Sequence, residues 1–176
     1  FEGSAIAVGA PFWDDAAAGT GSVSLFYYDP IQARYVREHF VRHTDTDEFG
    51  TSVAMHEGRL VVGAPCTLVA GVESGALVAY EVSPLAVDFV GRYPGSDGGR
   101  LGESVALSRD PAGAVRCAVG EPLFGGGGFE RGAVRVFLAS DLLGWIPEVR
   151  LSPGDQVDGA RVGSDVCFDR FALLGS

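Results

Sequence analysis

Short motifs recur along the chain in a fixed order, and this repetition constrains the fold more than any other feature of the sequence. The first motif reads Gly9-Ala10-Pro11, and it returns as Gly63-Ala64-Pro65 and, with one residue changed, as Gly120-Glu121-Pro122. Twelve residues after the first glycine of each copy, a further glycine opens an apolar run, at Gly21, Gly75 and Gly132. Repetition at a period of about 55 residues predicts that one supersecondary unit is stacked several times along the chain.

A third motif precedes the first in each unit and strengthens this interpretation. It begins Phe49-Gly50 in one unit and Leu101-Gly102 in the next, and a looser copy begins Val162-Gly163. Because all the motifs keep the same order, chance is a poor explanation. The repeats divide the chain into units at residues 1–42, 49–93 and 101–151, with the opening of another at 162–176.

Within each unit the residue pattern predicts four short strands. Val53 and Met55 alternate with Ser52 and Ala54, which is the two-residue period of a β-strand. The strands expected in the second unit cover residues 51–56, 60–64, 75–82 and 87–93. The matching strands in the other units are expected at 23–28, 35–41, 115–119, 133–138 and 145–151. No helical periodicity is sustained anywhere.

Repeated units of four antiparallel strands predict an all-β chain built as the blades of a β-propeller. Glycine and alanine suit positions where neighbouring blades converge, because a larger side chain has no room there. The alternative is an ordinary β-sandwich, which gives no reason for a 12-residue spacing to be kept three times. We therefore expect residues 1–176 to form one propeller fragment of about three blades, the first of them lacking its opening strand.

Phe49-Gly50 and Gly63-Ala64-Pro65 resemble the FG-GAP repeat of integrin alpha subunits and of many other surface proteins. The resemblance covers almost the whole chain, and Leu101-Gly102 with Gly120-Glu121-Pro122 is a degenerate copy. It implies a seven-bladed propeller whose remaining blades belong to the same, longer chain. It also implies an extracellular or cell-surface location and a non-catalytic role in recognition or adhesion, with a protein or glycan as ligand. The same repeats also occur beside catalytic domains, so an accessory part of a secreted or surface enzyme is the alternative.

Composition restricts the partners. The chain has 23 acidic and 13 basic residues and a net charge of −10, with no lysine, so its field repels nucleic acids and anionic lipid headgroups. No apolar run approaches the ~20 residues that cross a bilayer, so direct membrane insertion is not expected. Cys117 and Cys167 align with apolar positions of the other units and are expected in the core, whereas Cys66 is the one cysteine expected to react.

Motifs for metal or catalytic chemistry are missing where the repeat would carry them. The family's calcium loop needs a ladder of carboxylates between the first two strands of a blade, and residues 56–59 and 108–113 lack it. Calcium is therefore possible in the family but not expected in this segment, and no other cofactor is indicated. His39 and His43 could share one strand face, but they lack a third zinc ligand and are expected to be surface or interblade residues. Without a G-x-S-x-G motif, nothing in the sequence favours an enzyme.

The remaining candidate is a binding surface on the loops. In propellers of this kind the loops between second and third strands share one face with the connections between blades, and here two of them carry aromatic residues beside charged ones. Large aromatic side chains with a charged fringe are typical of interface hot spots. The alternative is that these aromatic side chains fold back and seal gaps between blades. The candidate binding residues are Phe12, Trp13, Asp14, Asp15, Phe124 and Phe129.

Overall fold

The computed structural model describes residues 4–14, 19–44, 46–96, 98–125, 130–152 and 159–168, and all regular structure in them is β. The first sheet has the order β1-β2-β3, and the second and third have the orders β4-β5-β8-β9 and β10-β11-β12-β13. All neighbours within a sheet are antiparallel. The prediction of an all-β chain of antiparallel sheets is therefore confirmed.

Nine strands agree closely with the expected ranges, while β1 and β10 had been expected only as members of the repeat, without ranges of their own. The first sheet contains β1 (Ala5–Ala10), β2 (Ser22–Asp29) and β3 (Arg34–Val41). The second contains β4 (Ser52–His56), β5 (Arg59–Ala64), β8 (Ala76–Val82) and β9 (Val87–Pro94). The third contains β10 (Val105–Arg109), β11 (Val115–Glu121), β12 (Ala133–Ser140) and β13 (Gly144–Leu151). A short hairpin of β6 (Leu68–Val69) and β7 (Val72–Glu73) lies in the connection from β5 to β8.

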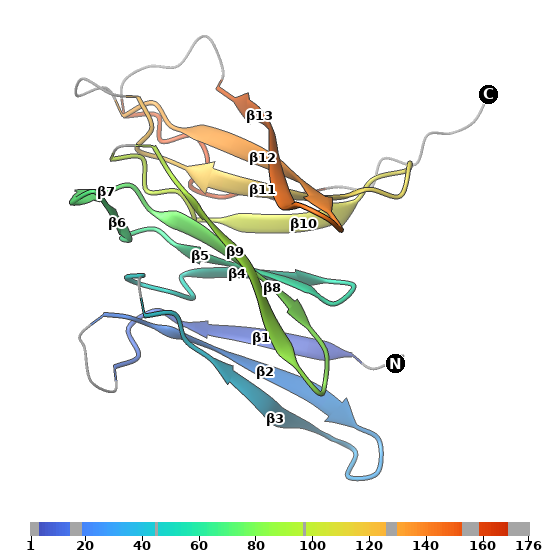
Figure 1. The fold of residues 1–176 in the computed structure, drawn as a ribbon. Coiled ribbons are helices and arrows are strands. Elements are labelled where there is room, and N and C mark those ends of the chain that lie inside the picture. The colour runs from blue at the N-terminus through green and yellow to red at the C-terminus, as the bar shows by residue number, and fades with distance from the viewer. Residues whose placement is uncertain are drawn as a thin grey trace.

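Figure 1 shows the three sheets following one another in chain order, with the second sheet between the other two. Strand β4 contacts β1 on one side and β10 on the other. Successive residues of β5 point to opposite sides, so Leu60 and Val62 pack toward the first sheet while Val61 packs toward the third. The second sheet therefore buries both of its faces, which explains why β5 is a continuous apolar run.

The recurring motifs meet at the junctions between sheets. A Cβ atom at Gly63 would overlap the carbonyl oxygen of Gly102, which belongs to the third motif of the next unit. The same overlap recurs between Gly9 and Gly50 and between Gly120 and Gly163. The glycines that open the following apolar runs form parallel bridges to the same segments, in the pairs Gly21 with Phe49, Gly75 with Leu101, and Gly132 with Val162. One close-packed backbone contact is thus built three times from the same residues.

Irregularities in strand pairing are also repeated from unit to unit. The last two strands of each unit pair through a register shift, which lies between Leu25 and Phe26, between Ala79 and Tyr80, and between Val136 and Phe137. These three bulges occupy the same place in the repeat, so they are built-in features of the unit. None of the described residues belongs to a helix that could cross a membrane.

Candidate binding surface at the loop end of the sheets

Loops and inter-sheet connections leave the sheets at one end, which we name the loop end. It comprises the described residues of three loops, 11–14 with 19–21, 65–75, and 122–125 with 130–132, together with the described residues of the connections that begin at residues 42, 95 and 152. Backbone hydrogen bonds join each loop to the connection that follows it: the amides of Phe49, Leu101 and Val162 donate to the carbonyls of Thr20, Ser74 and Arg131 at 3.0–3.1 Å. The opposite end, where tight turns join consecutive strands, is the turn end.

Phe12 and Trp13 are neighbours in the chain but have different surroundings. The side chain of Phe12 is 78% exposed at the loop end. Trp13 is half-buried and packs edge-on against Phe40 of β3, with 4.8 Å between ring centroids. The guanidinium of Arg42 lies 5.5 Å from the centre of the Trp13 ring. Phe12 is therefore available to a partner, whereas Trp13 covers the outer side of the first sheet.

The two acidic candidates beside them are Asp14 and Asp15, and the structure describes the first of them. Asp14 is exposed, and its Oδ1 atom accepts a hydrogen bond from the Gly19 amide, so it caps its own loop. Asp15 lies outside the described residues, as does Phe129 in the third loop. Among the described residues, the exposed carboxylate of Asp14 is therefore the one that belongs to the charged fringe expected around Phe12 and Trp13.

Phe124 is half-buried and packs on a charge cluster built around the buried Glu121. Arg150 lies over its ring, 4.1 Å from the ring centre, and also lies 3.5 Å from the Oε2 atom of Glu121. Glu121 is fully buried where the other two units have alanine, and its Oε2 atom lies 3.2 Å from the Nε atom of Arg135. Burial lowers the pKa of Arg135, and the attraction of the Glu121 carboxylate opposes that shift. Two arginines thus offset one buried carboxylate, and Phe124 covers the cluster.

The Glu121 cluster also ties the third sheet to the second. The amide of Ser96 donates to Glu121 Oε1 at 2.5 Å, and the Ser96 hydroxyl accepts from Arg135 and Arg150 at 3.0 and 2.8 Å. Arg135 also donates to the carbonyl of Pro94 at 2.9 Å. No contact joins Phe124 to Phe12 or Trp13 among the described residues. The structure therefore does not gather Phe12, Trp13 and Phe124 into one patch.

The sequence predicted only a loop from residue 66 to residue 74, whereas the structure forms the β6–β7 hairpin within it. It projects from the loop end beside the second sheet (Figure 1), and Leu68 and Val72 are exposed on it. Its turn residues Ala70 and Gly71 both have positive φ, as a tight two-residue hairpin turn requires. The sequence signal for this hairpin is the pattern Leu-Val-Ala-Gly-Val-Glu, in which the small dipeptide Ala-Gly separates the two residues of one strand from the two residues of the next.

The cysteines differ from expectation in part, whereas both histidines lie against residues of the second sheet. Cys117 is buried in the core, as predicted, whereas Cys167 is exposed. Burial and the neighbouring Glu48 raise the pKa of Cys66 to about 11, and Arg100 donates a hydrogen bond to its sulfur at 3.2 Å, an environment that disfavours the thiolate form expected to react. His39 lies against the carbonyl of Ser83 and His43 against the ring of Phe89, so the two imidazoles have separate neighbours.

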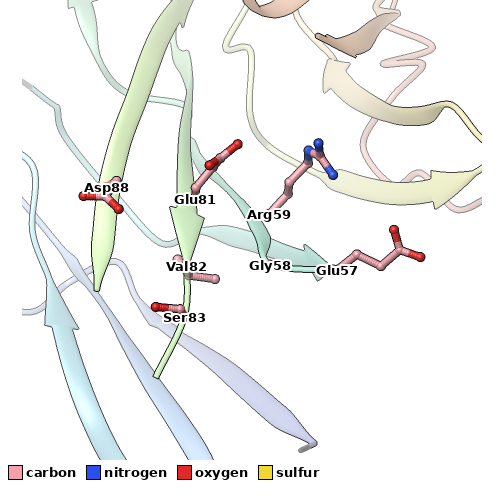
Figure 2. Close-up of a pocket in the computed structure, with 7 residues that line it drawn as sticks. All are labelled: Glu57, Gly58, Arg59, Glu81, Val82, Ser83 and Asp88. Carbon is pink, nitrogen blue, oxygen red and sulfur yellow. The ribbon is translucent and has the colours of Figure 1, made fainter. Parts of the chain in front are cut away.

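The turn end carries a hollow of about 360 Å³ between strands β5, β8 and β9, drawn in Figure 2. Its acidic side chains are Glu57, Glu81 and Asp88, and Figure 2 shows Glu57 extending away from the other two. Glu57 is held by Arg109, whose hydrogen bonds lower the pKa of its carboxyl group. In the described part of the chain no three His, Cys, Asp or Glu side chains converge on one point where a metal ion could sit.

The turn end also has isolated aliphatic side chains that the sequence analysis did not single out. Ile31, Leu85 and Leu142 are almost fully exposed, each at the tip of a turn between the last two strands of its sheet. Single exposed apolar residues are common on protein surfaces and form no patch by themselves. They serve as control positions when the exposed apolar residues of the loop end are tested for binding.

Comparisons with known proteins do not place the chain in a family. A scan against protein-family models found no match, and a search of curated proteins found none either.

Proposed function

We propose that this chain is a segment of an FG-GAP-type β-propeller that acts as a non-catalytic scaffold for recognition outside the cell or at its surface. Its ligand is a protein or a glycan, bound by loop-end residues. The exposed candidates there are Phe12, Leu68 and Val72.

One observation supports this proposal above the others. The glycine contacts between sheets are built three times from the same motif positions, which is what consecutive blades require, and the hairpin loops and inter-sheet connections lie together at one end. A rigid stack of sheets holds such loops in fixed relative positions, so binding loses little conformational freedom of the scaffold. The interactions at Trp13 and Phe124 support sealing for those two residues and leave Phe12 and the β6–β7 hairpin as the exposed anchors.

Binding to arrays of immobilised glycans and extracellular proteins tests the proposal. The chain is compared with a loop-end variant, Phe12→Ala with Leu68→Ala, and with a turn-end variant, Leu85→Ala with Leu142→Ala. Both variants remove two large exposed apolar side chains, so they are matched in the number of side chains truncated and in expected effect on stability. We expect binding to fall at least about tenfold in the loop-end variant, because truncating a hot-spot residue costs about 2 kcal/mol or more and about 1.4 kcal/mol is a tenfold change in affinity.

The turn-end variant should bind like the unchanged chain. Loss of binding in the turn-end variant alone would place recognition at the other end and contradict the proposal. Failure of the unchanged chain to bind any glycan or protein on the arrays would contradict the recognition role itself.

A further inference from the structure

An arginine near the end of β13, Arg150, keeps hydrogen-bond donors that the fold does not use. Its side chain is 35% exposed. The Nη2 atom donates to the Ser96 hydroxyl at 2.8 Å and lies 3.5 Å from the Oε2 atom of Glu121. Among the described residues, the Nε and Nη1 atoms have no hydrogen-bond partner. These N–H groups can donate charge-assisted hydrogen bonds to an anion.

The guanidinium of Arg150 is held in place by three separate segments of the chain. The ring of Phe124, in the loop that follows β11, lies 4.1 Å from it. Glu121 ends β11, and Ser96 belongs to the connection between the second and third sheets. A side chain that is positioned before its ligand arrives loses little conformational entropy on binding.

The local charge around Arg150 is positive. One buried carboxylate, that of Glu121, faces two guanidinium groups, with Arg135 at 3.2 Å and Arg150 at 3.5 Å. Burial lowers the pKa of Arg135, and the positive charge of Arg150 adds to that shift. The two arginines therefore still repel each other, and a second anion beside them would offset the excess positive charge.

The hydroxyl of Ser96 adds a further donor beside Arg150. Its oxygen accepts hydrogen bonds from Arg135 at 3.0 Å and from Arg150 at 2.8 Å. A hydroxyl that accepts two hydrogen bonds still has its own proton to donate. Among the described residues, no acceptor for that proton is found. An anion next to Arg150 is therefore offered an O–H donor as well as N–H donors.

This arrangement is specific to the third unit. Arg92 of β9 is the equivalent of Arg150 in the second unit, but it pairs with Val78, whereas Arg150 pairs with Arg135. The motif position that holds the buried glutamate in the third unit is Ala64 in the second. The second unit therefore has the arginine without the charge cluster, and Arg92 serves as a matched control.

We propose that Arg150 and the Ser96 hydroxyl bind a carboxylate of the ligand, and that this ligand is an acidic glycan in which a uronic acid supplies the carboxylate. The inference rests on the proposed recognition function and names the ligand class for one subsite of the loop end. The chain's net charge of −10 repels a partner with many carboxylates, such as an acidic protein. A single carboxylate on an otherwise neutral sugar meets the local positive charge at Arg150 instead.

Three immobilised disaccharides that differ in one group test the ligand class. The first ends in glucuronic acid, the second in glucose, and the third in the methyl ester of glucuronic acid. We expect the chain to bind the first at least about tenfold more tightly than the other two, because the charged carboxylate alone accepts charge-assisted hydrogen bonds. Since the protein is the same in all three measurements, folding does not affect the comparison.

Two variants test the position of the subsite. Arg150→Gln should remove the preference for glucuronic acid over glucose, whereas Arg92→Gln should keep it. A preference that persists in Arg150→Gln, or that Arg92→Gln loses equally, would overturn the inference. Equal binding of all three disaccharides by a chain that binds a protein or a neutral glycan on the arrays would overturn the inference alone. A chain that binds nothing on the arrays and none of the disaccharides would overturn the proposed function with it.

Discussion

At the scale of single residues, the repeated glycines are explained by the backbone of the neighbouring sheet. Gly63 is not a turn residue with positive φ; it lies at the end of β5, where any side chain would overlap the carbonyl of Gly102. Gly102 itself has a φ of 100°, which strongly favours glycine. The two glycines thus have different physical causes, and both allow the sheets to approach closely.

Gly63→Ala should therefore destabilise the protein strongly. The added methyl group meets backbone that cannot move without separating two sheets, so we expect a loss of about 3 kcal/mol in the free energy of unfolding. Gly71→Ala is the matched control, since it adds the same methyl group in open space and costs only the strain of its positive φ, about 1 kcal/mol. Urea denaturation measures both values, and equal losses would show that the close contact is not needed.

The cysteines give a prediction that depends on pH. The thiolate is the reactive form, and a pKa of about 11 leaves Cys66 almost entirely protonated until the pH rises toward 11. At pH 8 we expect iodoacetamide to label exposed Cys167 first, Cys66 much more slowly, and buried Cys117 only after unfolding. Peptide mass spectrometry at low protein concentration follows the order. Labelling of Cys66 as fast as Cys167 at pH 8 would contradict the assigned environment.

At the scale of elements, the two-residue alternation and the repeat period predicted the strands of the three sheets to within a few residues. Both signals arise from local backbone geometry and from burial on both faces, which leave a clear trace in sequence. The β6–β7 hairpin escaped because each of its strands has two residues, too few to show alternation. The bulges also escaped, since an extra residue in one strand is recognised only against its partner.

The candidate site was less predictable than the fold. Aromatic residues in loops predicted a surface, but the position of each ring depends on residues far away in sequence: Phe40 and Arg42 for Trp13, and Arg150 for Phe124. The buried Glu121 stands where the other two copies of the motif have alanine, and its two arginine partners lie on later strands. Such long-range pairs cannot be derived from local patterns in one sequence.

At the scale of the whole molecule, two kinds of surface differ in the residues that they expose. The loop end exposes Phe12 together with Leu68 and Val72 of the β6–β7 hairpin, whereas the outer faces of the first and third sheets expose Ile6, Val8 and Leu151. We propose that recognition uses the loop end.

The central claim is that one unit is stacked through one repeated junction, as in consecutive propeller blades. An experimental high-resolution structure of the 176-residue chain tests it most directly. We expect that one rotation about a single axis superposes the first sheet on the second and also the second on the third. The glycine contacts should be intact at every junction. The claim would be contradicted by a structure in which two sheets face each other across one core and a different rotation relates the third sheet to them.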